Sequence, residues 1–133
     1  ASEEFEIVKT EKEDKAIEPD VAVIHAQKAD EFGNVRIEGP LYEDVIKAKA
    51  AKKVVVTVEE LISAGEIRKT PEATTLPHFI VDAVVEVPKG AYPCSCFNYY
   101  DTDYDHIQEY LQAAAKDTFE QYLDKCVYRR ESK

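Results

Sequence analysis

An almost unbroken apolar run extends from Val21 to Ile24, directly after Pro19 and Asp20. Such a run is typical of a strand that is buried on both faces, as in a parallel sheet covered by helices. Polar residues that can take part in chemistry or binding follow it, namely His25, Gln27, Lys28 and Asp30. Because ligands of open α/β sheets bind at the carboxyl ends of the strands, we predict that this end of the strand is the functional edge.

The segments that follow predict an α/β fold. Residues 41–51 carry apolar side chains at helical spacing, and a β-branched run at residues 54–58 follows at once. A strand, a helix and a strand at this spacing favour a right-handed parallel crossover. Residues 59–64 favour a short helical turn, and residues 79–87, with prolines on both sides, favour a third strand. We therefore predict a mostly parallel sheet flanked by helices.

A long aromatic segment at residues 89–105 separates the third strand from two predicted helices. Loops of this length are more often functional or interface-forming than idle. Asp105 with Gln108, and Asp117 with Glu120, have the spacing of a capping box, so we expect a helix to begin at each.

Length and charge exclude several classes of protein. With 133 residues the chain is long enough for one domain with a core, which we place at residues 19–133 after a charged segment at 1–18. No apolar run approaches the roughly 20 residues needed to span a membrane, and the N-terminus does not resemble a signal peptide. A net charge of −10 argues against nucleic acid as a partner, although a local basic pocket could still hold a small anionic ligand.

The cysteines and the absence of methionine bear on the origin of the chain. Three cysteines without metal-type spacing predict a reducing compartment, the cytoplasm. Methionine is absent throughout, including position 1, so we expect either a piece of a longer protein or a processed product.

Several residues have both a functional and a structural interpretation. His25 and Gln27 could bind or polarise a carbonyl at the strand end, or could be hydrogen-bonded structural groups beside the sheet. Asp30 with the Gly33-Asn34 pair could line a ligand edge or form a tight turn. Five aromatic residues of the long segment could stack on an adenine or acyl group, or pack at an interface: Tyr92, Phe97, Tyr99, Tyr100 and Tyr104.

No motif points to a metal or a nucleotide phosphate. Cys94-Ser95-Cys96 is too short for the usual zinc pair, and Cys126 fits a helix core, so we predict no metal site. A phosphate-binding glycine loop, a nucleophile elbow and a dinucleotide fingerprint are all missing.

Five blocks of the sequence, taken together, resemble family I coenzyme A transferases, in particular the α (A-type) subunit of the glutaconate CoA-transferase group. They lie in one collinear order within residues 17–128, at residues 20–37, 50–51, 56–60, 77–85 and 88–96. The resemblance implies the CoA-transferase (NagB/RpiA-like) α/β fold and corresponds to the C-terminal portion of such a subunit.

The resemblance also implies an activity. These enzymes move CoA from an acyl-CoA to a carboxylic acid, through a glutamate that attacks the thioester and backbone amides that stabilise the oxyanion. In the two-subunit members that glutamate belongs to the β (B-type) subunit. The resemblance therefore implies a hetero-oligomer with a CoA-transferase β subunit, a CoA thioester as substrate, no covalently bound cofactor and no catalytic residue in this chain.

Five positions are the best matches to a substrate or CoA pocket on the α subunit: His25, Gln27, Gly90, Tyr92 and Ser95. Tyr92 stands where glutaconate-type members usually have His in a Gly-Ala-His-Pro motif. We therefore expect no imidazole role at this position, and the acid that the enzyme uses could differ from glutaconate.

Two other functions stay open on the sequence alone. Some relatives hydrolyse a CoA thioester or open a ring on it, and acceptance of water instead of a carboxylate would identify that activity. A non-catalytic interaction domain, whose aromatic segment binds a protein partner, would bind the β subunit without affinity for CoA.

Overall fold

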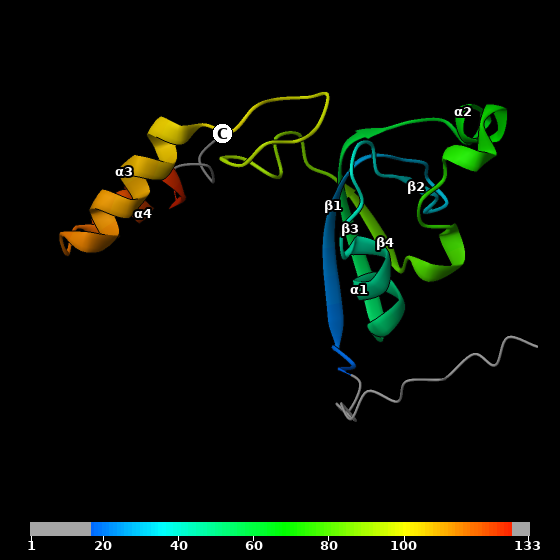
Figure 1. Ribbon diagram of the computed structural model, residues 1–133, viewed down its shortest axis with the longest axis horizontal. Helices are drawn as coiled ribbons and strands as arrows, with labels where there is room; N and C mark the ends of the chain where they lie inside the picture. The colour runs from blue at the N-terminus through cyan, green and yellow to red at the C-terminus, as the bar shows by residue number, and fades with distance from the viewer. Residues whose placement is uncertain (1–16, 129–133) are drawn as a thin grey trace, which may run out of the picture.

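Strand β1 (Val21–Ala29) lies inside a four-stranded sheet of order β2-β1-β3-β4 in the computed structural model, which describes residues 17–128 (Figure 1). It pairs in parallel with β3 (Lys53–Leu61) and antiparallel with the short β2 (Val35–Arg36). Strand β4 (Ala83–Glu86) pairs in parallel with β3. The predicted mostly parallel sheet flanked by helices is therefore confirmed.

One face of this sheet carries the hydrophobic core. Side chains alternate between the two faces of a strand, so every second residue of β1 and β3 points to the same side. Helix α1 (Asp44–Ala50), which we predicted at residues 41–51, adds the buried Ala48 to this core. The strand residues buried there are Ala22, Ile24, Ala26, Val54, Val56 and Val58.

The prediction that the first strand is buried on both faces is wrong for the part of the chain that the structure describes. Val21 is 52% exposed and Val23 is 71% exposed, and both lie on the face away from the core. Further along the same face, Gln27 and Glu59 are buried. The described residues thus cover this face at the carboxyl ends of the strands and leave it open at the amino ends.

The predicted helical turn at residues 59–64 is also wrong. Residues 59–61 continue β3, and helix α2 (Ala64–Lys69) begins where we expected a helix to end. The Ser63 side chain accepts a hydrogen bond from the Glu66 backbone N–H, as an N-cap does. This cap fixes the start of α2 after the strand.

The third predicted strand, at residues 79–87, is shorter than expected. After the 3₁₀ turn η1 (Pro71–Ala73), a second 3₁₀ turn η2 (His78–Ile80) takes its first residues, and β4 begins only after Asp82. The Asp82 carboxylate accepts a hydrogen bond from the Val54 backbone N–H at 2.8 Å. At this end of the sheet, a side chain thus takes the place of a backbone carbonyl as the acceptor.

The two predicted C-terminal helices are present and pack on each other as α3 (Tyr104–Ala115) and α4 (Phe119–Cys126). Figure 1 shows them apart from the sheet, beyond the long loop that follows β4. Their predicted caps are wrong. Asp103 caps α3 by accepting the His106 N–H at 2.9 Å, and α4 follows Thr118 without a side-chain cap.

The charged segment predicted at residues 1–18 lies outside the described residues except for its last two. Within residues 17–128, no helix has the length and apolar character that crossing a membrane would require.

Candidate functional site

A tight turn after β1 brings the chain back along the functional edge. The Asp30 carboxylate, 1% exposed, accepts the backbone N–H groups of Phe32 at 3.0 Å and Asn34 at 2.9 Å, and the Asn34 side-chain amide at 2.9 Å. Gly33 has a φ of +95°, which glycine adopts without strain. Because the Asp30 oxygens are all engaged within the turn, the turn interpretation of these residues fits the structure.

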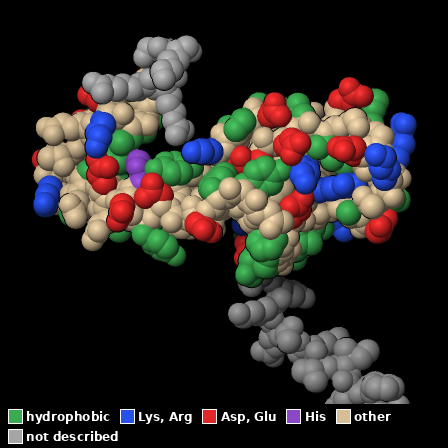
Figure 2. Space-filling view, turned by 90° about the horizontal axis from the view of Figure 1, so that it is seen from above, with side chains coloured by type: hydrophobic (Ala, Val, Ile, Leu, Met, Phe, Trp, Pro, Cys, Tyr) green, Lys and Arg blue, Asp and Glu red, His purple; other side chains and the backbone are tan. Residues whose placement is uncertain are grey.

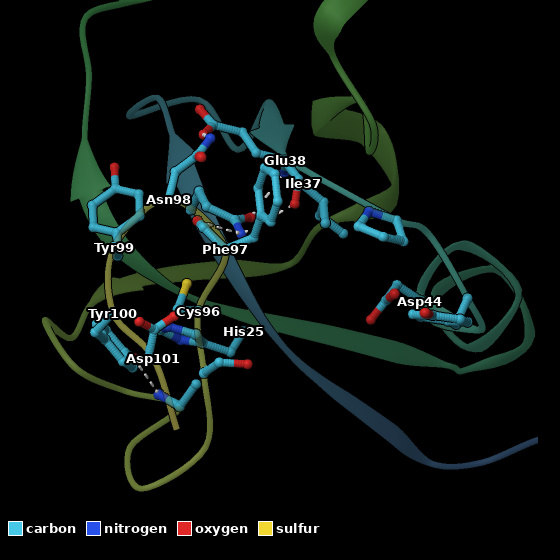
Figure 3. A pocket seen from close by; sticks show the side chains of 15 residues that line it. His25, Ile37, Glu38, Asp44, Cys96, Phe97, Asn98, Tyr99, Tyr100 and Asp101 are labelled. Carbon is cyan, nitrogen blue, oxygen red and sulfur yellow. Dashed lines mark hydrogen bonds between the residues drawn. The ribbon is translucent and has the colours of Figure 1, made fainter. Parts of the chain in front are cut away.

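A cavity of about 740 Å³ lies at the carboxyl ends of β1 and β3, on the face away from the core (Figure 3). This is the edge that the sequence predicts as functional. His25 and Gln27 line it from β1, and the loop after β4 lines the other side with Ser95, Cys96 and Phe97. The volume is within the range of small-molecule sites.

Glu59 is the centre of the hydrogen-bond network beneath this cavity. Its Oε1 accepts hydrogen bonds from His25 Nε2 at 2.8 Å and from the Tyr100 hydroxyl at 2.6 Å. Its Oε2 accepts the Lys89 backbone N–H at 2.7 Å. The Tyr100 hydroxyl in turn accepts the Ala91 N–H at 3.0 Å. One carboxylate at the end of β3 therefore holds both ends of the loop that walls the cavity.

These contacts determine the charge of the groups. Burial by itself raises the pKa of Glu59, but hydrogen bonds from Tyr100, from the Lys89 N–H and from His25 outweigh it, and the net pKa lies below its usual value. Burial and the hydrogen bond to Glu59 raise the pKa of Tyr100 to about 12. At neutral pH, Glu59 is thus an ionised acceptor and Tyr100 a protonated donor.

His25 uses both ring nitrogens inside the protein. A carboxylate only accepts hydrogen bonds, so the Nε2 that contacts Glu59 carries a hydrogen. Nδ1 lies 2.8 Å from the Thr57 hydroxyl, and Thr57 is the register partner of His25 in β3. His25 lines the cavity, but no ring nitrogen is free to bind a substrate carbonyl.

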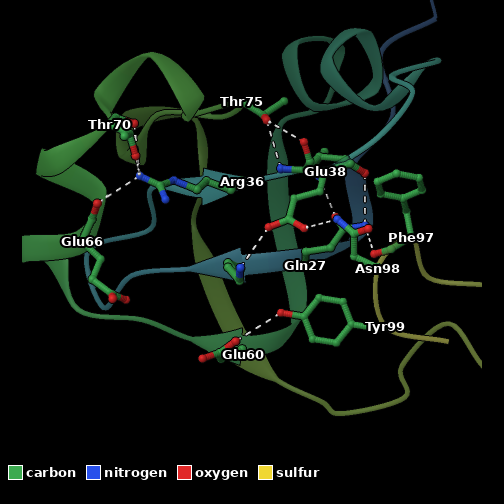
Figure 4. A network of polar contacts seen from close by, with 12 residues as sticks. Gln27, Arg36, Glu38, Glu60, Glu66, Thr70, Thr75, Phe97, Asn98 and Tyr99 are labelled. Atoms are coloured by element: carbon green, nitrogen blue, oxygen red, sulfur yellow. Dashed lines mark hydrogen bonds and ion pairs between the residues drawn. The ribbon is translucent and has the colours of Figure 1, made fainter.

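Gln27 is also committed to the main chain (Figure 4). Its Oε1 accepts the Glu38 N–H at 2.9 Å, and its Nε2 donates to the carbonyl oxygens of Glu38 at 3.2 Å and Phe97 at 3.4 Å. Gln27 thereby joins β1, the segment after β2 and the cavity loop, and its side chain shapes the wall instead of projecting from it.

The other three predicted positions differ in their placement. Ser95 is exposed and lines the cavity. Gly90 lies against the ring of His25, because a Cβ on it would come within 2.6 Å of His25 Cε1. Tyr92 does not line this cavity; its hydroxyl donates to Asp103 at 2.7 Å and its ring centroid lies 5.1 Å from that of His106. The structure therefore gathers His25, Gln27, Gly90 and Ser95 and places Tyr92 toward α3.

His25, Glu59 and Cys96 have the right chemistry for a metal, since one ligand atom of each lies within 4.8 Å of the others. In this structure the His25 and Glu59 atoms are hydrogen-bonded to each other at 2.8 Å. Burial, followed by the charges of Glu59 and Glu38, raises the pKa of the Cys96 thiol, which disfavours the thiolate that binds metal. The expectation of a site without metal stays a prediction.

Reasoning from the sequence did not single out Glu59, and it considered Tyr100 only as an aromatic ring that could stack on a ligand or pack at an interface. A signal for Glu59 is present, since it follows Thr57 at a spacing of two and so shares its face of the strand. A carboxylate at such a position needs a partner. Two of its partners, however, lie 30 and 41 residues further along the chain, and His25 lies 34 residues before it. Strand periodicity gives no information at such separations.

The comparisons with known proteins identify the class. Residues 14–87, more than half of the chain, match the family model described as Coenzyme A transferase, and the chain belongs to this family. Within it, the chain is 42% identical over 110 residues to the α (A-type) subunit of glutaconate CoA-transferase from Acidaminococcus fermentans, and the match covers 82% of this chain and 34% of that one. The crystal structure of that enzyme superposes with a TM-score of 0.80 at 41% identity, covering 84% of this chain and 36% of its own.

The names of two further relatives indicate reactions other than CoA transfer. A crystal structure of a variant of the decarboxylase AibA/AibB superposes with a TM-score of 0.73 at 38% identity, covering 84% of this chain and 40% of that chain. The cholesterol ring-cleaving hydrolase IpdA subunit of Mycobacterium tuberculosis is 30% identical over 104 residues, or 75% of this chain and 35% of that protein. The chain thus spans about a third of the length of these curated relatives.

Proposed function

We propose that this chain forms part of the α subunit of a heteromeric CoA-transferase, which moves CoA between an acyl-CoA and a carboxylic acid. Membership of the family and similarity to a glutaconate CoA-transferase α subunit support this function. The cavity at the carboxyl ends of β1 and β3 is the part of the thioester pocket that this chain supplies. The attacking glutamate belongs to the β subunit, and CoA enters as a substrate.

The observation that carries the proposal is that the Glu59 carboxylate is fully engaged in hydrogen bonds within this chain. It is the most buried carboxylate beside the cavity, yet both of its oxygens already accept hydrogen bonds within the chain. An attacking carboxylate needs an oxygen that can reach the thioester carbon. Glu59 therefore holds the wall in place, which supports an attacking carboxylate from outside this chain.

The test compares three mixtures that contain an acyl-CoA and a carboxylic acid. They are the 133-residue chain alone, the chain with a CoA-transferase β subunit, and both together with the remaining two-thirds of the A. fermentans α subunit. We expect CoA exchange in the third mixture and none with the chain alone. Exchange by the isolated chain would refute the proposal.

Hydrolysis of a CoA thioester is the second candidate, favoured by the similarity to a ring-cleaving hydrolase subunit. The same mixtures decide between the two functions. Release of free CoA without a carboxylic acid acceptor indicates hydrolysis, whereas formation of a new acyl-CoA indicates transfer. The cytoplasmic location stays a prediction; Cys94, Cys96 and Cys126 are free thiols in the described residues.

A further inference from the structure

We propose that the cavity selects an uncharged acyl group, so that the enzyme uses monocarboxylic acids in preference to dicarboxylic acids. This inference rests on the proposed function and specifies its substrate class. It concerns the distal end of the acyl group, beyond the carbon that reacts.

The charged side chains that line the cavity are acidic. Glu38, Asp44 and Asp101 line it, and no Lys or Arg does so in the part of the chain that the structure describes. Figure 3 shows Asp44 on one side of the cavity and Asp101 on the other. Glu38 is paired with Lys28 at 3.0 Å, but none of the ion pairs within residues 17–128 includes Asp44 or Asp101. On this chain's side of the cavity, a second carboxylate in the substrate would therefore meet the negative charges of Asp44 and Asp101.

Three of the polar side chains that line the cavity are engaged in hydrogen bonds within the chain. Both ring nitrogens of His25 are hydrogen-bonded to Thr57 and Glu59. The Tyr99 hydroxyl donates to Glu60 at 3.2 Å, and the Tyr100 hydroxyl donates to Glu59 at 2.6 Å.

The remaining donors are weak or already engaged. The Asn98 amide donates to Glu38 at 2.9 Å, and Ser95 and Tyr42 offer only neutral hydroxyls. Bidentate recognition of a carboxylate by Arg, the usual solution, is not available from the described lining.

Apolar surface supplies the binding energy for an uncharged group. Ile37, Pro40, Tyr42 and Phe97 line the same cavity, whose volume of about 740 Å³ admits a short or medium acyl chain. On the face seen in Figure 2, the Lys and Arg side chains gather at the end of the molecule that carries α2. Lys28, Arg36 and Lys69 line a separate hollow of about 340 Å³, to which α2 contributes Lys69.

The test uses two acids of equal chain length, pentanoate and glutarate, which differ by one distal carboxylate. In the active mixture with the β subunit, we expect kcat/KM for pentanoate to exceed that for glutarate by about tenfold or more. Asp44→Asn and Asp101→Asn should each lower the ratio of kcat/KM for pentanoate to kcat/KM for glutarate by about threefold. Asp20→Asn, at the opposite edge of the sheet where Asp20 pairs with Lys52, is the matched control and should leave this ratio unchanged.

A binding measurement separates the failure of this inference from the failure of the proposed function. Saturation-transfer NMR on the 133-residue chain compares the two acids without any turnover, and pentanoate should give the stronger signal. Equal or stronger binding of glutarate, or a pentanoate-to-glutarate ratio that Asp44→Asn and Asp101→Asn both leave unchanged, would overturn the inference. Absence of turnover with every acid, together with the expected binding preference, would instead reject transfer and leave the selectivity standing.

Discussion

At the scale of single residues, the central feature is a buried carboxylate with three donors. Hydrogen bonds to charged groups contribute more than neutral ones, and a buried donor left without an acceptor is costly. The donors are His25 Nε2, the Lys89 N–H and the Tyr100 hydroxyl. Only the ionised Glu59 carboxylate can accept all three hydrogen bonds. The cavity wall therefore depends on its charge as well as on its shape.

Glu59→Gln keeps the shape and replaces one acceptor oxygen by a donor NH₂ group. Since all three partners donate to Glu59, one of them then faces another donor. We expect the free energy of unfolding in urea to fall by about 2–3 kcal/mol. Glu60→Gln, whose exposed carboxylate accepts only the Tyr99 hydroxyl in the described residues, should cost less than about 0.5 kcal/mol. Equal losses for the two variants would contradict this assignment.

The pH dependence of stability follows from the lowered pKa of Glu59. A group whose pKa is lower in the folded protein contributes stability above its unfolded pKa, near 4.5, and loses it as pH falls through the folded pKa. The stability difference between the wild type and Glu59→Gln should therefore be constant from pH 7 to about 5.5 and shrink below about 4.5. Urea unfolding across this range measures it, and a difference that grows in acid would have the wrong sign.

Gly90 is required by its contact with His25. A Cβ at position 90 would lie 2.6 Å from His25 Cε1, so Gly90→Ala should cost about 1–3 kcal/mol through overpacking. In a His25→Ala background the same change should cost less than half as much, because the obstructing ring is gone. Gly65→Ala is the control: its nearest side-chain atom is 3.6 Å away, and within α2 the change should be neutral or stabilising. Additive costs at positions 90 and 25 would contradict the contact.

At the scale of elements, the centres of the strands could be predicted from sequence, and their ends could not. The apolar runs within β1 and β3 carry a local signal, because periodicity and β-branching are properties of neighbouring residues. The last residues of β3 include Glu59, two of whose partners come from a loop that folds back over the sheet. The same limit applies to the site, since His25 and Gln27 could be placed at the edge but their hydrogen-bond partners could not.

The long loop and the helical pair are joined through Asp103, which caps α3 and accepts the Tyr92 hydroxyl. Asp103→Ala removes both contacts, so we expect α3 to fray at its start and the thermal midpoint to fall. Asp105→Ala, two positions further on and without a cap contact, should have a smaller effect. Hydrogen exchange of the first amides of α3 provides the site-specific readout, and equal protection in both variants would argue against the cap.

At the scale of the whole molecule, the cavity and the open sheet face lie on the same side of the sheet. Val21 and Val23 are exposed there, and the loop after β4 covers only the carboxyl ends of the strands within residues 17–128. Because the chain spans about a third of the length of the two curated relatives compared above, we expect residues from outside this chain to complete the pocket of the proposed enzyme. The sequence alone could predict the family, through the combination of five separated blocks, but not the open face, which depends on what else packs against the sheet.

Locating the covalent intermediate is the most direct measurement. The mixture of this chain, the remaining two-thirds of the A. fermentans α subunit and the β subunit is incubated with an acyl-CoA, quenched and digested. The peptide that carries CoA as a glutamyl thioester is then identified by mass spectrometry. We predict that the CoA is attached to a glutamate of the β subunit and that no peptide of this chain is modified. CoA attached to Glu59, or to any other carboxylate of these 133 residues, would contradict the assignment of the attacking group to another chain.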